Sequence, residues 1–175
     1  QSDNSTTAAE TLVAYQSIDT DGDGTNDIFS NTSTVANWNT YIDALNSFQD
    51  TGVIVFALSN QSYHADADIA AGLPEISTNL QEAWINVANI DVTGTGAPAD
   101  NGYELRSAPC GSTAEYCLGA DGWNILGAGG NEYSVGGFDY SVSIGTSYAA
   151  PQVSGAVALL ATHFPNHSPE QLADR

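Results

Sequence analysis

The chain has 175 residues, 42% of them hydrophobic, which is enough for the core of a single domain. Two Arg and no Lys stand against 21 acidic residues, so the formal charge is -19, and nucleic acid and anionic membrane surfaces are excluded as partners because phosphate binding needs cationic side chains. No apolar run approaches the roughly 20 residues that span a bilayer, and the polar first residues carry no basic start of a signal peptide. The chain thus looks already processed, and such acidity with many Asn, Ser, Thr and Gly residues suits a protein that is secreted or at the cell surface.

The first predicted element is a strand over residues 11–18, which are rich in apolar and β-favouring side chains. An acidic segment, D-T-D-G-D-G-T-N-D, follows at residues 19–27. Its alternating carboxylates point several oxygens at one hard cation, so we expect a calcium ion bound by Asp19, Asp21, Asp23 and Asp27. The alternative is a solvated acidic turn.

A short strand over residues 28–34 and a helix over residues 35–49 come next. Trp38, Ile42 and Leu45 recur at helical spacing, and either Phe48 or Gln49 completes this core-facing stripe. The continuous apolar run at residues 53–58 predicts a strand buried on both faces of a parallel sheet. Because helices alternate with such strands, the predicted fold is α/β.

Polar residues stand where the apolar strand ends, and ligands gather at the carboxyl ends of strands in open α/β sheets. Asn60 is the most prominent of them. By itself it reads as a turn residue or, with Ser62, as a glycosylation acceptor. A further strand is predicted over residues 83–91.

Two cysteines, Cys110 and Cys117, lie seven positions apart in a polar loop that contains glycine. This spacing allows a small disulfide-closed loop in an oxidising compartment, and the alternative is a pair of free thiols. Two cysteines without neighbouring histidines are too few for a zinc site, so we predict the disulfide.

The most informative stretch is residues 145–155, which read G-T-S-Y-A-A-P-Q-V-S-G. Gly145 allows an unusual backbone before Ser147, and Pro151 is tolerated only near the opening turn of a helix. Ser147 therefore stands at the positive end of a core helix, where developing negative charge is stabilised. An arbitrary Gly-Thr-Ser would more often be a simple helix cap.

This stretch fills every fixed position of G-T-S-x-A-x-P-x-V-x-G, the nucleophile motif of the subtilisin-like serine proteases, or subtilases, and the chain resembles that family from residue 12 to residue 172. The resemblance implies a three-layer subtilisin-like α/β fold with a mostly parallel central sheet, Ser147 as the nucleophile and Asn60 as the oxyanion-hole donor. It also places Ala57, Leu58 and Ser59 in the substrate-binding wall, although Leu58 and Ser59 replace the family's alanine and glycine. The cysteine pair ahead of A-D-G looks like that of bacterial autotransporter subtilases.

The resemblance covers only the later part of a subtilase domain, so we expect residues 1–175 to form a single partial catalytic domain. The family's H-G-T-H motif is absent from this sequence, and the D-T-D-G at residues 19–22 stands too late to be the triad aspartate. The triad Asp and His are therefore expected upstream of this chain or on another chain. The predicted function is that of a secreted, calcium-binding serine endopeptidase acting on polypeptides; the alternative is a non-catalytic cell-surface protein that keeps the scaffold.

Overall fold

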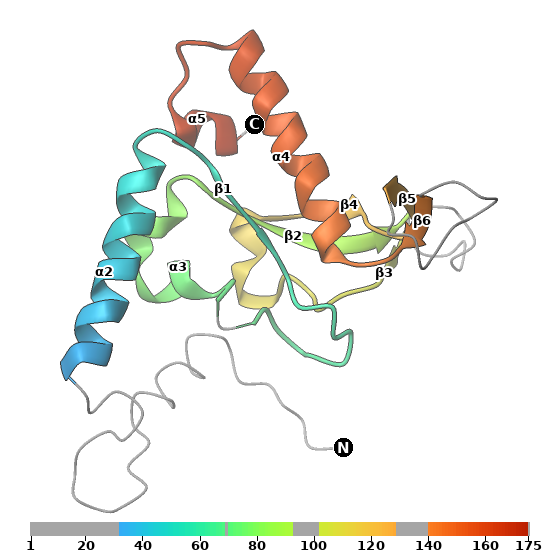
Figure 1. Cartoon of the computed structure of the whole chain (residues 1–175), viewed down its shortest axis with the longest axis horizontal. Coiled ribbons are helices and arrows are strands. Elements are labelled where there is room, and N and C mark those ends of the chain that lie inside the picture. The colour runs from blue at the N-terminus through green and yellow to red at the C-terminus, as the bar shows by residue number, and fades with distance from the viewer. Residues whose placement is uncertain (1–31, 69, 93–101, 129–139, 175) are drawn as a thin grey trace, which may run out of the picture.

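The computed structural model describes residues 32–68, 70–92, 102–128 and 140–174, and in these ranges helices cover a small sheet (Figure 1). The helices, with 3-10 turns marked η, are α2 (Thr32–Gln49), α3 (Leu73–Ile76), η1 (Thr78–Gln81), η2 (Gly111–Tyr116), α4 (Thr146–His163) and α5 (Pro169–Ala173). The strands are β1 (Ile54–Ala57), β2 (Trp84–Asp91), β3 (Glu104–Leu105), β4 (Cys117–Asp121), β5 (Ile125–Ala128) and β6 (Tyr140–Ser143).

The sheet is organised around β2. Its residues 84–87 pair in parallel with β1 and its residues 86–90 in parallel with β4, while the short β3 joins its end in antiparallel pairing. Ile90 pairs with both β3 and β4, so these two strands lie on opposite edges of β2. The antiparallel hairpin β5–β6 stands apart from this sheet and leads directly into α4.

β2 is buried on both faces, and its apolar residues alternate with two fully buried asparagines, Asn86 and Asn89. Successive side chains of a strand point to opposite faces, so Ile85 and Val87 face α4 whereas Trp84 and Ala88 face the other layer. Complete burial of a side chain such as Val87 contributes about 1.5–3 kcal/mol. The strand predicted over residues 83–91 is confirmed.

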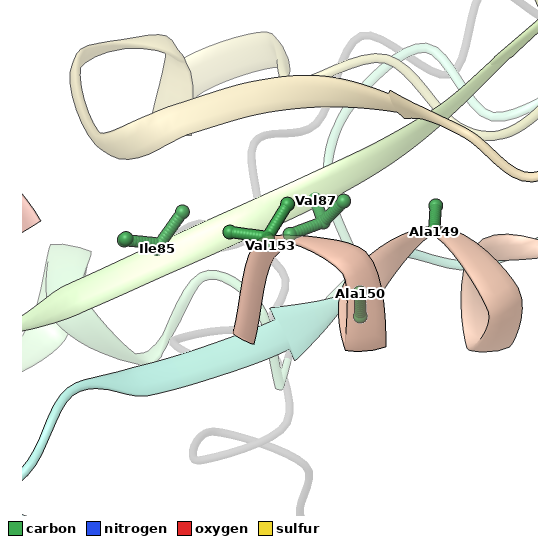
Figure 2. Close-up of a cluster of buried hydrophobic side chains, with 5 residues drawn as sticks. All are labelled: Ile85, Val87, Ala149, Ala150 and Val153. Carbon is green, nitrogen blue, oxygen red and sulfur yellow. The ribbon is translucent and has the colours of Figure 1, made fainter. Parts of the chain in front are cut away.

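One layer consists of α4, which packs on β1, β2 and β4. Its contact surface is made of small residues, Ala149, Ala150 and Val153, which meet Ile85 and Val87 (Figure 2). Small side chains let the helix axis approach the sheet closely, and this brings the first turn of α4 to the carboxyl ends of the strands.

The opposite layer consists of α2, α3 and η1. Leu73, Leu80 and Trp84 form its core, and Ile42 and Leu45 of α2 pack against them. Gln49, which is 7% exposed, completes the inward face of α2, whereas Phe48 is 51% exposed. The side-chain amide of Gln49 donates to the carbonyl of Leu80 at 2.7 Å, and this hydrogen bond explains how a polar residue can lie on the buried face of the helix.

Several expectations can be compared with these elements. The strand predicted over residues 28–34 is wrong for its last three residues, because α2 begins at Thr32; Ser and Thr suit a helix start as well as a strand. The strand predicted over residues 53–58 is β1, which is parallel to β2 as expected but only half-buried. The strand predicted over residues 11–18 lies outside the described residues.

The three layers and the parallel pairing of β1, β2 and β4 confirm the predicted α/β fold. Within the described residues, none of the helices is both long and apolar enough to cross a membrane.

Candidate active site

Ser147 is the second residue of α4 and is exposed. The residue before the helix, Gly145, has φ 148° and ψ 162°, a conformation open almost only to glycine. Its N–H donates to the carbonyl of Gly122, which follows β4, at 2.9 Å. The glycine of the G-T-S sequence is thus needed to bring the chain from β6 into α4 with Ser147 facing solvent.

Thr146 joins this turn to Asn60, 86 positions earlier in the chain. The Thr146 N–H donates to Oδ1 of Asn60 at 2.8 Å, and its hydroxyl lies 3.1 Å from the same oxygen. The hydroxyl also donates to the carbonyl of Leu58 at 2.7 Å. Because a backbone N–H can only donate, these contacts assign the amide oxygen of Asn60 to Thr146 and leave its Nδ2 group as the donor on the solvent side.

Another asparagine, which is buried, also supports this turn. Asn89, in β2, is 0% exposed; its Oδ1 accepts the Gly122 N–H at 2.9 Å, and its own N–H donates to the Ser107 hydroxyl at 2.9 Å. Gly122 in turn accepts from Gly145. The sequence pattern did not single out Asn89 as a support of this turn. An Asn inside a buried strand could have been noticed, because a buried polar side chain needs a hydrogen-bond partner.

Arg106 also supports the loop after β4, through Trp123. Its guanidinium lies 3.0 Å from Asp91 and 2.7 Å from Glu104, and it stacks over the ring of Trp123 at 4.0 Å. The ends of β2 and β3 are thereby joined to the segment that follows Gly122. A planar guanidinium suits this combination of ion pairing and stacking better than a lysine would.

The residues predicted to line the substrate pocket lie at the end of β1. Ala57 is the last residue of the strand, and the Leu58 side chain, 2% exposed, packs inward against Ala67, Ala71 and Ala88. Ser59 is half-buried, and its carbonyl accepts the Ala108 N–H at 2.8 Å. This segment is therefore firmly held, and its role in substrate binding remains a prediction.

The histidines do not complete a catalytic pair with Ser147 within the described residues. His163 is the last residue of α4, about 24 Å from Ser147 at a rise of roughly 1.5 Å per residue, and His167 lies beyond it. His64 follows Asn60 in an exposed loop and stacks on Tyr63 with ring centroids 4.8 Å apart. None of the three histidines is therefore placed to act as the general base that Ser147 would need.

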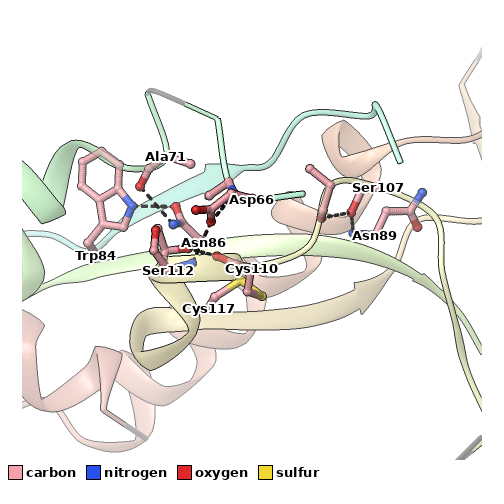
Figure 3. The surroundings of a disulfide bond; sticks show 12 residues. Asp66, Ala71, Trp84, Asn86, Asn89, Ser107, Cys110, Ser112 and Cys117 are labelled. Atoms are coloured by element: carbon pink, nitrogen blue, oxygen red, sulfur yellow. Dashed lines mark hydrogen bonds between the residues drawn. A yellow bond between two sulfur atoms is a disulfide. The ribbon is translucent and has the colours of Figure 1, made fainter. Parts of the chain in front are cut away.

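The cysteines form the predicted disulfide, Cys110–Cys117, which closes the η2 turn (Figure 3). The same loop is tied to its surroundings by Ser112, whose N–H donates to Asp66 at 2.7 Å, and by Tyr116, whose hydroxyl donates to Glu75 at 2.8 Å. Burial, and then the hydrogen bond to Glu75, raise the pKa of Tyr116 well above its usual value.

A cavity and the predicted metal site lie away from Ser147 or outside the described residues. A cavity of about 730 Å³ lies between α4, α5 and the turn after α2, lined among others by Asp50, Val157 and Phe164; it sits at the opposite end of α4 from Ser147 and takes no part in this site. No cluster of three or more metal-ligating side chains occurs among the described residues. The predicted calcium ligands Asp19, Asp21, Asp23 and Asp27 lie outside them.

Comparison with known proteins agrees with this geometry. An extracellular serine protease of Serratia marcescens is 30% identical over an alignment of 137 residues, which covers 69% of this chain and 12% of that protein. The solved structure of Sphericase matches with a TM-score of 0.52 at 21% identity, over 82% of this chain and 43% of that one, a likeness of fold. The chain thus spans less than half the length of either relative. The family model described as Subtilase family matches residues 1–175, and this chain belongs to the subtilase family.

Proposed function

We propose that this chain is the nucleophile-bearing portion of a secreted serine endopeptidase. Ser147 is the nucleophile, and the side-chain amide of Asn60 donates to the oxyanion. The observation that carries the proposal is the pair of contacts from Thr146 to Asn60 Oδ1, because they hold an amide donor beside the residue that precedes Ser147. A donor fixed in advance stabilises the charge that develops in the transition state.

The chemistry also requires a general base and the group that orients it. The Oγ of Ser147 forms a bond to the peptide carbonyl carbon while its proton passes to a histidine imidazole, and that proton then goes to the leaving amine as the C–N bond breaks. The histidine and its orienting aspartate are expected upstream of this chain or on another chain. The isolated 175-residue chain should therefore hydrolyse peptides very slowly.

Substrate and location follow from the same proposal. The substrate is a polypeptide whose reacting carbonyl approaches Ser147 past Ala57, Leu58 and Ser59 at the end of β1. Secretion is supported by the disulfide, since such bonds persist in oxidising compartments, and by the relative described as extracellular.

We also propose a structural calcium ion in the loop at residues 19–27. Asp19, Asp21, Asp23 and Asp27 are carboxylate donors, the ligand type that calcium prefers. The ion offsets the repulsion of the clustered carboxylates in a chain whose formal charge is already -19. Magnesium prefers a tighter octahedral site and should replace it poorly.

The alternative is a cell-surface scaffold protein that keeps the subtilase fold but does not use Ser147 as a nucleophile. A fluorophosphonate probe applied to the protein with its complete catalytic domain separates the two. We expect labelling that Ser147→Ala abolishes. Ser154→Ala is the matched control, because Ser154 lies on the same helix and bonds only the carbonyl of Ala150, so labelling should persist. A folded protein that takes up no probe at all would establish the scaffold instead.

A further inference from the structure

The oxyanion donor stands on a loop that has no regular secondary structure. Asn60 is exposed, and residues 58–66 contain neither helix nor strand. The contacts with Thr146 fix only the end of its side chain. Catalysis by a hydrogen-bond donor depends on placement to within a fraction of an ångström, so the backbone beneath Asn60 must also be held.

The carboxylate of Asp68 holds that backbone. Its Oδ2 accepts the N–H of Ser59, the residue before Asn60, at 2.9 Å. Its Oδ1 accepts the N–H groups of Ala70 and Ala71, each at 3.1 Å. One charged group therefore joins both ends of the loop, and hydrogen bonds to an ionised acceptor are among the stronger ones.

The far end of this link is anchored in the core. Ala71 is fully buried, and its carbonyl accepts the side-chain amide of Asn86 in β2 at 3.0 Å, which Trp84 in turn orients at 2.8 Å (Figure 3). On the other side of Ser59, its carbonyl accepts the N–H of Ala108. Both peptide groups of Ser59 are thus fixed, and with them the direction in which the chain enters Asn60.

We propose that Asp68 is a positioning residue for the oxyanion donor Asn60, an inference that rests on the function proposed above. Asp68 acts through the backbone of Ser59 and does not itself touch the substrate. It sets where the Nδ2 group of Asn60 stands when negative charge develops on the substrate oxygen.

The chain offers a matched control in Asp66, a second carboxylate of the same loop with the same half-buried exposure. Asp66 uses a single oxygen, Oδ1, to accept the N–H groups of Ala67 and Ser112. Asp66→Asn retains an oxygen at that position. Asp68→Asn does not retain both acceptors, because one of the two oxygens becomes an NH₂ group that faces an N–H. Both substitutions remove one negative charge.

The test is steady-state peptide hydrolysis by the protein with its complete catalytic domain. Asp68→Asn should lower kcat by about tenfold with KM within about twofold, below the roughly 10²–10³-fold loss of kcat measured in another member of this family when the donor itself is removed. Asp66→Asn should leave both constants within about twofold. In an Asn60→Ala background, Asp68→Asn should cause no further loss of kcat, because the donor it positions is gone. An equal loss in both backgrounds, or a change in KM alone, overturns the proposal.

A second measurement separates this proposal from the proposed function. Hydrogen exchange of the Ser59 and Thr146 amides reports the loop and the Asn60 contact without any turnover. Asp68→Asn should accelerate exchange at both amides by at least about tenfold relative to Asp66→Asn. If Ser147 takes up no probe but this acceleration is found, the peptidase assignment fails while the positioning stands. Equal exchange in the two variants refutes the role of Asp68 even in an active enzyme.

Discussion

Replacing Thr146 by Val tests the contact that brings the two halves of the candidate site together. Val has nearly the same shape, so the substitution removes the hydroxyl and leaves no large cavity. Thr146 is 1% exposed, and its hydroxyl donates to the carbonyl of Leu58 and lies 3.1 Å from Oδ1 of Asn60. The carbonyl of the buried Leu58 loses its donor, whereas Oδ1 of Asn60 keeps the N–H of Thr146.

The size of the effect follows from these contacts. A buried hydrogen bond contributes about 1 kcal/mol net, and leaving its buried partner unsatisfied costs about 1–3 kcal/mol. We therefore expect Thr146→Val to lower the free energy of unfolding by about 2 kcal/mol. In a domain of 150–250 residues this corresponds to a fall in Tm of roughly 4–8 °C.

The assay is urea and thermal unfolding followed by circular dichroism, with Thr162→Val as the control. Thr162 lies on the same helix, but its exposed hydroxyl bonds only the carbonyl of Ala158, four residues earlier. Its replacement should change the free energy of unfolding by less than about 0.5 kcal/mol. If the two variants unfold at the same urea concentration, Thr146 does not hold Asn60 and Leu58 as described.

Three other predictions concern the rest of the fold. Cys110→Ser with Cys117→Ser should lower the free energy of unfolding by about 2–3 kcal/mol, as expected for a short closed loop, and reductant should match it in the wild type; insensitivity to both contradicts this. Because the pKa of Tyr116 is raised, the folded state keeps a proton that the unfolded chain releases above about pH 10. Stability should therefore decline as the pH rises beyond that value, and less steeply in Tyr116→Phe; identical alkaline declines would be the adverse result. Calcium should raise Tm more than magnesium at equal ionic strength, and Asp21→Ala or Asp23→Ala should remove the difference; without such a difference the loop is an acidic turn.

The elements that the sequence predicts correctly are those whose cause is local. The strand at residues 83–91 follows from its own apolar composition, and the disulfide follows from a separation of seven positions. In each case the residues that decide the structure are neighbours in the chain.

The errors and open choices occur where distant segments decide. Phe48 and Gln49 both fit the helical stripe of α2, and only the nearby carbonyl of Leu80 makes Gln49 the inward residue. Similarly, Ser and Thr at the start of α2 are compatible with strand or helix, and their own propensities do not choose between the two. Propensity is a weak guide when tertiary contacts are this close in energy.

The candidate site divides in the same way. The sequence by itself determined the family, because Gly145 and Ser147 belong to a motif that can be read from adjacent residues, and that motif predicts Ser147 as the nucleophile. Only the tertiary structure decided which groups hold that chemistry in place. Asn60 meets Thr146 across 86 positions, and Asp68 takes the N–H of Ser59 in a loop whose sequence looks merely polar. The identity of a reactive group is a property of residue type, whereas its placement depends on hydrogen bonds between chain segments that only folding brings together.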